Sequence, residues 1–500
     1  MITNKLKKIL YFPLAYYFKF FAKIQLAIWK PRIIVVTGSS GKTTLLHLIE
    51  SQLQNKARYS HFANSSYGIP FDILGLRRKD LTVGEWPYLF LAAPFRAFRK
   101  PPKEKLYVVE ADCDRPYEGK FLASLLKPEV TLWTNVSRTH TANFDSVVIA
   151  RSPAQRDDEA ISVGGLPHQS ADWFAMTQVE EAIAHEFGYF LEATKDLAIV
   201  NDDSELIKKQ IRRSKAKIKK VSQKNTEYHK VFKNHIEFKI NGKAYSINAL
   251  LPKEASLSIQ MTLLLLNYLK IKPDNSFSKF KLPPGRTSVF KGIKNNTIID
   301  SSYNATPDGV KAILNMFGLY PSDKKWLVLG DMIELGNEEQ EEHEKIADVI
   351  NAMKLDKIIL VGPRLLKYTY PKLKILFNRH PELVSGSLNE NPKFEYRNSK
   401  QCQMTKIQNS KRFEHSDFDQ AKPENLFRIS NFGIRILPYE MPKDALDYLT
   451  DNLKGGEVVL FKGARFLEGI IQHLLIDKND VKKLPRRERV WQIRRKQWGL

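Results

Sequence analysis

Short apolar runs alternate with amphipathic stretches along much of the chain. The run at residues 33–36 leads into a loop rich in Gly and Ser, and the next stretch, TTLLHLIESQL, repeats its apolar residues at helical spacing. Further apolar runs at residues 106–110, 130–136 and 196–201 predict strands, and residues 257–271 predict an apolar helix. Short apolar strands between helices are typical of parallel sheets covered on both faces, so the sequence predicts an α/β fold.

The same alternation resumes beyond Pro283 and Pro284, which predict a boundary. The strings TIIDSSYNATP, KKWLVLGDMIELG, KIILVG and EVVLFKG again alternate with helical patterns. We therefore expect two α/β domains between a helical N-terminal segment and a basic tail. Their predicted ranges are residues 1–31 for the basic aromatic segment, 32–283 for the central domain, 284–480 for the C-terminal domain and 481–500 for the tail.

Two polar stretches interrupt the predicted domains, at about residues 146–177 and about 379–422. Both lack periodicity and are longer than loops in compact domains usually are. We interpret them as insertions that are disordered surface passengers. The alternative is that one of them forms a lid or a loop for a partner.

The overall charge is strongly positive. The chain of 500 residues has 79 Lys and Arg against 55 Asp and Glu, a formal net charge of +24, concentrated at residues 208–220 and 482–496. Such a charge attracts polyanions, but a basic surface is more often simply solvated, and we expect no nucleic-acid partner. Cys113 and Cys402 are too few for a disulfide framework, which favours the cytoplasm.

The N-terminal segment is apolar, aromatic and basic. Lys19, Lys23 and Gln25 interrupt its apolar residues, and no small-residue cleavage site follows, so it predicts neither a membrane span nor a signal peptide. Two interpretations remain open. Residues 1–30 either form a helix that packs on the domain behind them, which we favour, or make peripheral contact with an anionic membrane.

The loop TGSSGKTT lies between a predicted strand and a predicted helix. In this position backbone amides point at phosphate oxygens, Lys42 adds charge at the outer phosphates, and Thr43 offers a hydroxyl to Mg²⁺. The strict phosphate-loop motif would have Gly in place of Val36, so the position of the loop carries much of the prediction. The residues expected to bind ATP are Thr37, Gly38, Ser39, Ser40, Gly41, Lys42, Thr43 and Thr44.

The loop and a series of later strings resemble the Mur ligase family. In the family's order these are NSSYGIP from residue 64, VVEAD from 108, TNVSRTH from 134, PPGR from 283, IIDSSYNATPD from 298, VLGDMIELG from 328 with His343 downstream, and VVLFKGAR from 458. The resemblance covers about residues 32–475 without the insertions. Within the family, YNATP and LGDMIELG are most similar to the members that add D-alanyl-D-alanine to a UDP-muramoyl tripeptide.

The resemblance implies a P-loop central domain with a mostly parallel sheet and a C-terminal Rossmann-like α/β domain. It implies an ATP-dependent carbon–nitrogen ligase of peptidoglycan synthesis, which phosphorylates an acceptor carboxylate and lets an amine attack the acyl phosphate. The implied substrates are a peptidoglycan precursor and D-alanyl-D-alanine, and the implied cofactors are ATP and Mg²⁺.

The resemblance also assigns roles on the ATP side. The implied catalytic residues are Lys42, Glu110 and His140, and the implied metal ligands are Thr43, Glu110 and His140.

Other residues are expected to approach from the second domain or from the substrate. Arg286 would hold a phosphate and Asp300 the ribose hydroxyls, with Asn304 beside them, which implies that the two domains close over ATP. The implied substrate-side residues are Asn64, Ser65 and Lys462, the last of which would face an anionic peptide.

Three departures from the family pattern qualify the prediction. Phe187 stands where the family has a carbamylated lysine that bridges two metal ions, so Glu186 or His185 would have to replace it, or the second ion is held loosely, or activity is low. Ser301 replaces the second of two expected acids after Asp300. Only about thirty residues precede the loop, so the usual N-terminal UDP-binding domain is expected to be missing.

These departures leave alternatives open. One is a Mur-like ligase with another acceptor, which could be linked to a lipid and reached through the N-terminal segment. Another is a weakly active or non-catalytic scaffold that binds nucleotide. A basic ATPase acting on nucleic acid would not need the later strings.

Overall fold

The computed structural model describes residues 2–61, 63–78, 83–138, 141–144, 169–379 and 435–500. Of the stretch predicted as an insertion at about 146–177, residues 169–177 form the start of a long helix, α8 (Gln169–Ala193), and the others lie outside the described residues. The stretch at about 379–422 lies outside them beyond its first residue. The role of both stretches therefore stays a prediction.

Six parallel strands form the first sheet, in the order β2-β3-β1-β4-β5-β6. They are β1 (Arg32–Thr37), β2 (Ala57–Tyr59), β3 (Leu106–Ala111), β4 (Val130–Trp133), β5 (Leu197–Asn201) and β6 (Lys217–Val221). The strands predicted at residues 33–36, 106–110 and 196–201 are confirmed. The strand predicted at 130–136 ends at Trp133, because the next residues turn to hold the neighbouring loop.

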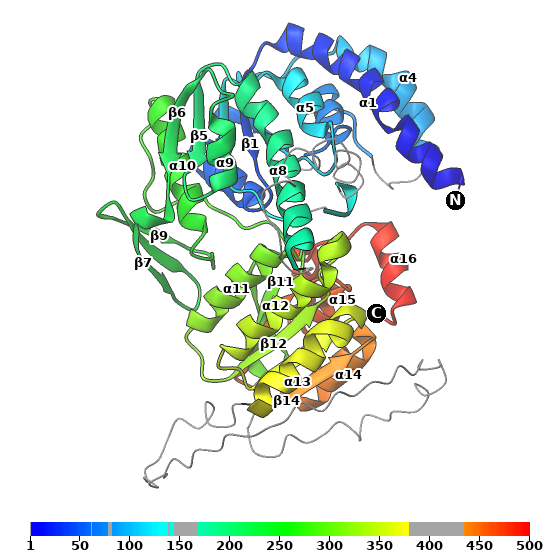
Figure 1. Cartoon of the computed structure of the whole chain (residues 1–500), viewed down its shortest axis with the longest axis vertical. Helices are drawn as coiled ribbons and strands as arrows, with labels where there is room; N and C mark the ends of the chain where they lie inside the picture. Colours follow the sequence, from blue (N-terminus) through cyan, green and yellow to red (C-terminus); the bar gives the residue numbers. More distant parts are fainter. Residues whose placement is uncertain (1, 62, 79–82, 139–140, 145–168, 380–434) are drawn as a thin grey trace.

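Helices cover both faces of the first sheet (Figure 1). Ile33 and Val35 of β1 pack beneath helices on one face, and Ile34 and Val36 pack against helices on the other, as the period of two in a strand requires. The first group of helices is α1 (Ile2–Trp29), α3 (Gly68–Leu74), α4 (Trp86–Ala97), α5 (Glu118–Leu126), α8 and α9 (Glu205–Ile211). The second group is α2 (Lys42–Leu53) and α10 (Ala255–Tyr268), which confirms the apolar helix predicted near residues 257–271.

The N-terminal helix α1 packs on this unit. Phe18, Ala22 and Trp29 are fully buried in the core of the first face, and the Trp29 indole donates a hydrogen bond to the carbonyl of Glu104 at 2.8 Å. The favoured interpretation of residues 1–30 as a packing helix is confirmed. None of the helices in the described ranges combines the length and apolar character that crossing a bilayer requires.

A small antiparallel sheet follows the first one and was not predicted. Its strands are β7 (Thr226–Val231), β8 (Ile236–Ile240) and β9 (Lys243–Ile247). Alternate residues such as Ile236, Phe238 and Ile240 are buried and join a core shared with the second large sheet. The small sheet thus helps to join the two α/β units.

The second large sheet has the order β10-β11-β15-β12-β13-β14, with β10 antiparallel and the others parallel. Its strands are β10 (Ser288–Gly292), β11 (Asn296–Ser301), β12 (Lys325–Gly330), β13 (Lys357–Val361), β14 (Arg435–Tyr439) and β15 (Val458–Lys462). The helices on its faces are α11 (Pro307–Leu319), α12 (Glu339–Asn351), α13 (Tyr370–Arg379), α14 (Pro442–Asn452) and α15 (Leu467–Leu474). The predicted second α/β unit is confirmed.

The predicted basic tail is part of the folded core. It contains helix α16 (Arg489–Gln497), in which Arg495 is buried and donates hydrogen bonds to the Glu468 carboxylate at 3.4 Å and the Arg486 carbonyl at 2.8 Å. Glu468 itself is fully buried. A buried carboxylate needs such partners, so the tail neutralises a charge in the second unit.

Replacing Arg495 by Ala should therefore unfold the second unit more easily. We expect a loss of about 3 kcal/mol in the free energy of unfolding, the usual cost of removing one partner of a buried ion pair. Chemical denaturation followed by circular dichroism measures it, with the exposed Lys496→Ala as control. Equal stability of the two variants would show that the tail contributes nothing to the fold.

Candidate active site

The loop between β1 and α2 needs glycine at two positions. Gly38 has φ +127°, and a Cβ there would lie 2.3 Å from Thr134 Oγ1, so no side chain fits. Gly41 has φ +79° and immediately precedes α2, which begins at Lys42 and continues through Thr43 and Thr44. The loop thus turns tightly into the N-terminus of a helix, where free backbone amides and the helix dipole favour phosphate.

The residues after β4 hold this loop in place. Ser40 N–H donates to Asn135 Oδ1 at 2.8 Å, and Thr134 Oγ1 donates to the Ser40 carbonyl at 2.7 Å. Ser137 N–H donates to Ser39 Oγ at 2.9 Å. The sequence predicted the string TNVSRTH as metal-binding, but did not predict that its first residues support the loop.

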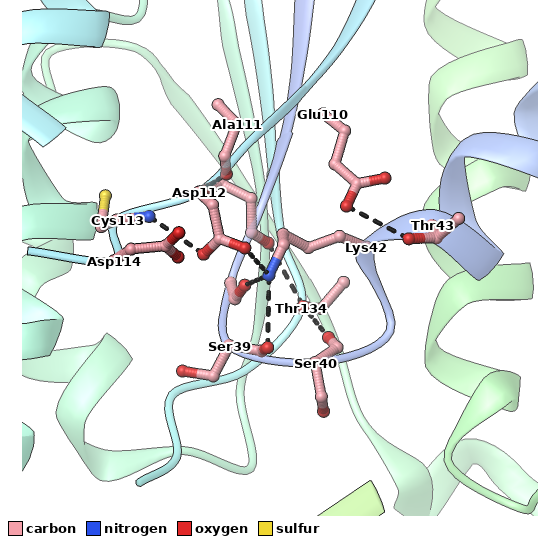
Figure 2. Close-up of polar contacts among 12 residues, drawn as sticks. Ser39, Ser40, Lys42, Thr43, Glu110, Ala111, Asp112, Cys113, Asp114 and Thr134 are labelled. Carbon is pink, nitrogen blue, oxygen red and sulfur yellow. Dashed lines mark hydrogen bonds and ion pairs between the residues drawn. The ribbon is translucent and has the colours of Figure 1, made fainter. Parts of the chain in front are cut away.

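Lys42 lies buried beneath the loop, at the centre of Figure 2. Its ammonium pairs with Asp112 Oδ2 at 2.8 Å and donates to the carbonyl of Gly38 at 2.5 Å. Burial by itself lowers the pKa of Lys42, but the nearby charges of Asp112 and Glu110 outweigh it and the net shift is upward. Lys42 is therefore a fixed positive charge, and Asp112, which the sequence did not assign to the site, is its counter-ion.

Glu110 and Thr43 meet beside this ion pair (Figure 2). Thr43 Oγ1 donates to Glu110 Oε1 at 3.1 Å. Burial raises the pKa of Glu110, and the positive charges of Lys42 and Arg286 work against that rise. A hydroxyl and a carboxylate side by side supply hard oxygen donors, so the residues present fit Mg²⁺ at the predicted place. His140, the third predicted ligand, lies outside the described residues.

Residues of the second unit reach the same region. The Arg286 guanidinium lies over the Tyr303 ring, 5.0 Å from its centroid, and its charge acts on both Glu110 and Lys462. Lys462 is buried and donates to the Asn304 carbonyl at 2.5 Å. The structure therefore brings Arg286, Asn304 and Lys462 together at the end of the second sheet, and the charge of Arg286 also acts on Glu110.

Asp300 occupies a buried position in this group. Its Oδ1 accepts hydrogen bonds from Ser302 N–H at 3.0 Å and Ser302 Oγ at 2.6 Å, and the side chain is fully buried. Burial raises its pKa to about 6. A hydrogen bond to ribose would require this carboxylate to become accessible, so that role stays a prediction.

Two of the predicted substrate-side residues, Asn64 and Ser65, lie just before α3, whereas the third, Lys462, ends β15 in the second unit. The Asn64 carbonyl accepts from Asp112 N–H at 2.8 Å, and Ser65 Oγ accepts from Gly68 N–H at 3.2 Å. The next residue, Ser66, donates from its amide to Glu118 Oε1 at 2.8 Å. This loop is thereby fixed next to the counter-ion of Lys42.

The strings LGDMIELG and VVLFKGAR join inside the second unit. Arg465 donates from Nε and Nη2 to Asp331 Oδ2, both at 2.7 Å. His343 is fully buried and accepts from Met332 N–H at 3.2 Å. These contacts brace the loop after β12; Asp331 and His343 are fully buried, and Arg465 is partly exposed.

Phe187 lies in the hydrophobic core. It is 1% exposed, and its ring centroid is 5.9 Å from that of Trp133. Glu186 has both carboxylate oxygens bonded to amides at the start of α5, from Tyr117 at 2.9 Å and Gly119 at 3.0 Å. His185, the other suggested substitute, packs its ring against Tyr189. Phe187 therefore offers no ligand atom, and each carboxylate oxygen of Glu186 is engaged by a backbone amide.

Arg138 connects the two units by charge. It pairs with Glu180 of α8 at 2.8 Å, and across the interface with Glu338 at 3.0 Å and Glu342 at 3.2 Å. Nearby, Thr141 Oγ1 donates to the Leu335 carbonyl at 2.7 Å. The sequence did not predict this cluster, because its partners lie about two hundred residues apart.

Comparison with known families agrees with this arrangement. Residues 36–148 match the Mur ligase middle domain, and residues 285–373 match the glutamate ligase domain of Mur ligases. The chain is therefore similar to Mur ligases in these two domains, and members of that family are ATP-dependent ligases that form amide bonds.

Two relatives within that family carry the same name. The UDP-N-acetylmuramoyl-tripeptide--D-alanyl-D-alanine ligase of Bacillus subtilis is 23% identical over 473 residues, 91% of this chain and 78% of the relative. The enzyme of that name from Escherichia coli is 23% identical over 68% of this chain and 67% of its own length.

Solved structures show the same fold. The MurF ligase of Thermotoga maritima, determined with ADP, superposes with a TM-score of 0.60 at 18% identity, covering 94% of this chain and 84% of that one. MurF from Acinetobacter baumannii gives 0.59 at 15% identity, covering 91% and 78%.

Placing the family's lysine at position 187 should disrupt the fold. Phe187→Lys should lower the free energy of unfolding by more than about 3 kcal/mol, because it removes a buried ring and buries an ammonium. Phe187→Leu, which keeps the site apolar, should cost about 1 kcal/mol. Urea denaturation compares the two. A Lys variant as stable as the wild type would place residue 187 at a solvated site.

The buried amine of Lys462 should make stability depend on pH. Burial and the nearby Arg286 lower its pKa to about 7, from 10.5 as an ordinary value. Between these values the unfolded chain binds the additional proton, so this group makes the free energy of unfolding rise with pH in that window.

Lys462→Met should therefore show a smaller rise in stability from about pH 7 to about pH 9 than the wild type. Denaturation curves at each pH test this, with the exposed Lys443→Met as control. Parallel curves for Lys462→Met and the wild type would mean that Lys462 is not desolvated.

Proposed function

We propose that this protein uses ATP to join D-alanyl-D-alanine to the free carboxylate of a UDP-muramoyl tripeptide in peptidoglycan synthesis. The observation that carries the proposal is the convergence of Lys42, Thr43 and Glu110 with Arg286 from the other unit. The names of the relatives from Bacillus subtilis and Escherichia coli support the choice of substrates.

The positively charged and amide groups of the site would bind the phosphates of ATP. The amides at the start of α2 and the Lys42 ammonium would hold the phosphates of ATP, and Arg286 would add positive charge from the second unit. Lys42 donates to the Gly38 carbonyl and pairs with Asp112, and these contacts hold its charge at the loop.

Mg²⁺ would be held by Thr43 Oγ1 and Glu110, the pair that is 3.1 Å apart. When bound, the ion neutralises phosphate charge during phosphoryl transfer. Asp112 keeps Lys42 oriented, and Asn64 joins the backbone of Asp112 to the loop that we assign to the acceptor.

The reaction forms one bond in each of two stages. The acceptor carboxylate takes the terminal phosphoryl group and ADP departs; the amine then attacks the acyl carbon, phosphate leaves, and the amine gives up a proton. We propose Lys462, buried beside Asn304 and Arg286, as a contact for the anionic end of the incoming dipeptide. Because the reaction needs ATP, we propose that the protein works in the cytoplasm.

A second candidate function is a scaffold with little or no activity, favoured by the burial of Phe187 and the commitment of Glu186 to backbone amides. Without a bridging lysine, the second metal ion would have fewer ligands. Activity measurements distinguish the two functions directly.

The ligase requires both substrates. Purified protein with ATP, Mg²⁺, UDP-muramoyl tripeptide and D-alanyl-D-alanine should release phosphate, and omission of either substrate should stop the release. Lys42→Ala should lower the rate by about a hundredfold or more, since it removes a fixed charge from the phosphates. The exposed Lys243→Ala on β9 is the matched control.

Thermal melting of Lys42→Ala separates lost chemistry from lost fold, because the change leaves Asp112 without its ion-pair partner. Phosphate release that ignores the amine would refute the ligase, and ATP binding without turnover would favour the scaffold.

We also propose that the peripheral membrane contact expected of residues 1–30 occurs through α1, which presents Tyr16 and Phe20 to solvent.

A further inference from the structure

Helices α1 and α4 lie side by side along one outer edge of the molecule (Figure 1). Of sixteen large apolar side chains exposed in the described residues, eight belong to these two helices and the residue that ends α4. Such a concentration marks an interaction surface, whereas scattered exposed side chains do not. They are Leu10, Tyr16, Phe20 and Ile28 with α1, and Tyr88, Leu91, Phe95 and Phe98 with α4.

On α4 the exposed side chains form a single stripe. Tyr88, Leu91, Phe95 and Phe98 follow one another at intervals of three or four residues, the spacing of one helical face. Their exposures are 57%, 71%, 81% and 70%, so most of each ring or chain contacts water. On α1, Tyr16 and Phe20 are four residues apart and 55% and 61% exposed.

The opposite faces of both helices are already packed. Leu89, Ala93 and Ala97 of α4 are fully buried in the core of the first unit, as is Phe18 of α1. Tyr17 OH donates to the Phe90 carbonyl at 2.8 Å and ties the two helices together. The exposed stripe is therefore not part of the core. A helix that is apolar on two opposite faces is expected to contact a second apolar partner through the face that the core leaves uncovered.

The charge around the stripe is mainly positive. Neither α1 nor α4 contains Asp or Glu. Exposed cations flank the apolar side chains on α1, on α4 and in the segment after it: Lys23, Lys30, Arg96, Lys100, Lys103 and Lys105. Glu104 lies among the cations of that last segment, and the cations outnumber it. Aromatic side chains beside an excess of Lys and Arg fit the boundary between acyl chains and anionic headgroups. A protein partner would have to be both apolar and acidic.

We propose that α1 and α4 together form a docking surface for an anionic lipid bilayer, with both helices lying in the plane of the headgroups. Leu91, Phe95, Phe98 and Phe20 would enter the acyl boundary, and the flanking cations would contact lipid phosphates. The sequence suggested a membrane contact only for residues 1–30. The exposed stripe of α4 adds a second helix to the proposed contact surface and defines which side of the protein would face the membrane.

Docking would bring the candidate acceptor loop close to the membrane. Tyr67 OH, in that loop, donates to the Tyr11 carbonyl of α1 at 2.5 Å, and the Arg115 guanidinium lies 3.8 Å from the centroid of the Tyr11 ring. If the proposed ligase function holds, this surface would let the enzyme work on a precursor at the membrane. The docking itself does not depend on ligase activity.

Sedimentation of the full chain with vesicles tests the surface. We expect binding to vesicles of phosphatidylcholine with phosphatidylglycerol, weaker binding at high salt, and little binding to phosphatidylcholine alone. Leu91→Ser with Phe95→Ser should weaken binding to the anionic vesicles by more than about tenfold, because two apolar side chains no longer leave water. Leu319→Ser, 59% exposed on α11, is the matched control and should bind like the wild type.

A charge variant tests the second half of the proposal. Arg96→Glu with Lys100→Glu should also weaken binding, and should remove most of its dependence on salt. Each variant changes exposed side chains only, and release of phosphate from soluble substrates should stay at the wild-type rate. This readout separates failure of the docking proposal from failure of the ligase proposal.

Three results would overturn the docking proposal. One is equal vesicle binding by the wild type and the Leu91→Ser, Phe95→Ser variant. Another is binding that is indifferent to phosphatidylglycerol. The third is a dimer in lipid-free solution that the variant abolishes, together with no vesicle binding, which would make this surface an interface between two copies of the chain.

Discussion

The buried ammonium of Lys42 is the charge around which the candidate site is organised. A charge removed from water must be paired and hydrogen-bonded, and Lys42 meets this demand with Asp112 and the carbonyls of Gly38 and Ser39. The pairing joins α2 to the end of β3 and so places Glu110 beside Thr43. The tight approach of Gly38 to Thr134 then closes the loop over the ammonium from the side of β4. A phosphate-binding loop and an oxygen-rich metal site therefore follow from the same constraint.

The second unit adds what the first sheet cannot supply. The loop, Lys42 and Glu110 all belong to the first unit, whereas Arg286 and Lys462 come from the second. Arg138, held by Glu180 on its own side and by Glu338 and Glu342 on the other, fixes the distance between the two units near the site. Because Arg138 faces several carboxylates, its removal would leave these negative charges close to one another without a counter-ion. The interface between the two units therefore depends on Arg138 more than on an ion pair at the exposed surface.

The sequence was sufficient for the parts of the fold that local pattern determines. The apolar strands β1, β3 and β5 and the loop TGSSGKTT were predicted where they lie, because continuous apolar runs and the turn residues identify them directly. The hairpin of β8 and β9 was missed although Asn241-Gly242 between alternating residues is a strong turn signal. Asp112 and Arg138 were missed for another reason, since their importance lies in partners brought near by the tertiary fold.

Phe187 shows how the structure changes the meaning of a family comparison. In the sequence, Phe187 stood in place of a metal ligand that Glu186 or His185 would have to replace. In the structure Phe187 packs on Trp133, and Glu186 binds the amides that begin α5. Phe187 is thus part of the hydrophobic core of the first unit, and Glu186 supports the start of α5, so the structure gives both residues a packing role that the sequence did not predict.

The N-terminal helix shows that the two interpretations offered by the sequence do not exclude each other. A strip of α1 that includes Phe18 and Trp29 is buried, while Tyr16 and Phe20 on the same helix remain in water. Packing on the ligase core is what gives the exposed side chains a fixed direction, because a helix free in solution would have no reason to align them with α4. The contact of Tyr11 with Tyr67 then couples that outer surface to the acceptor loop. One side of α1 thus packs on the core, and the other side belongs to the proposed lipid-binding surface.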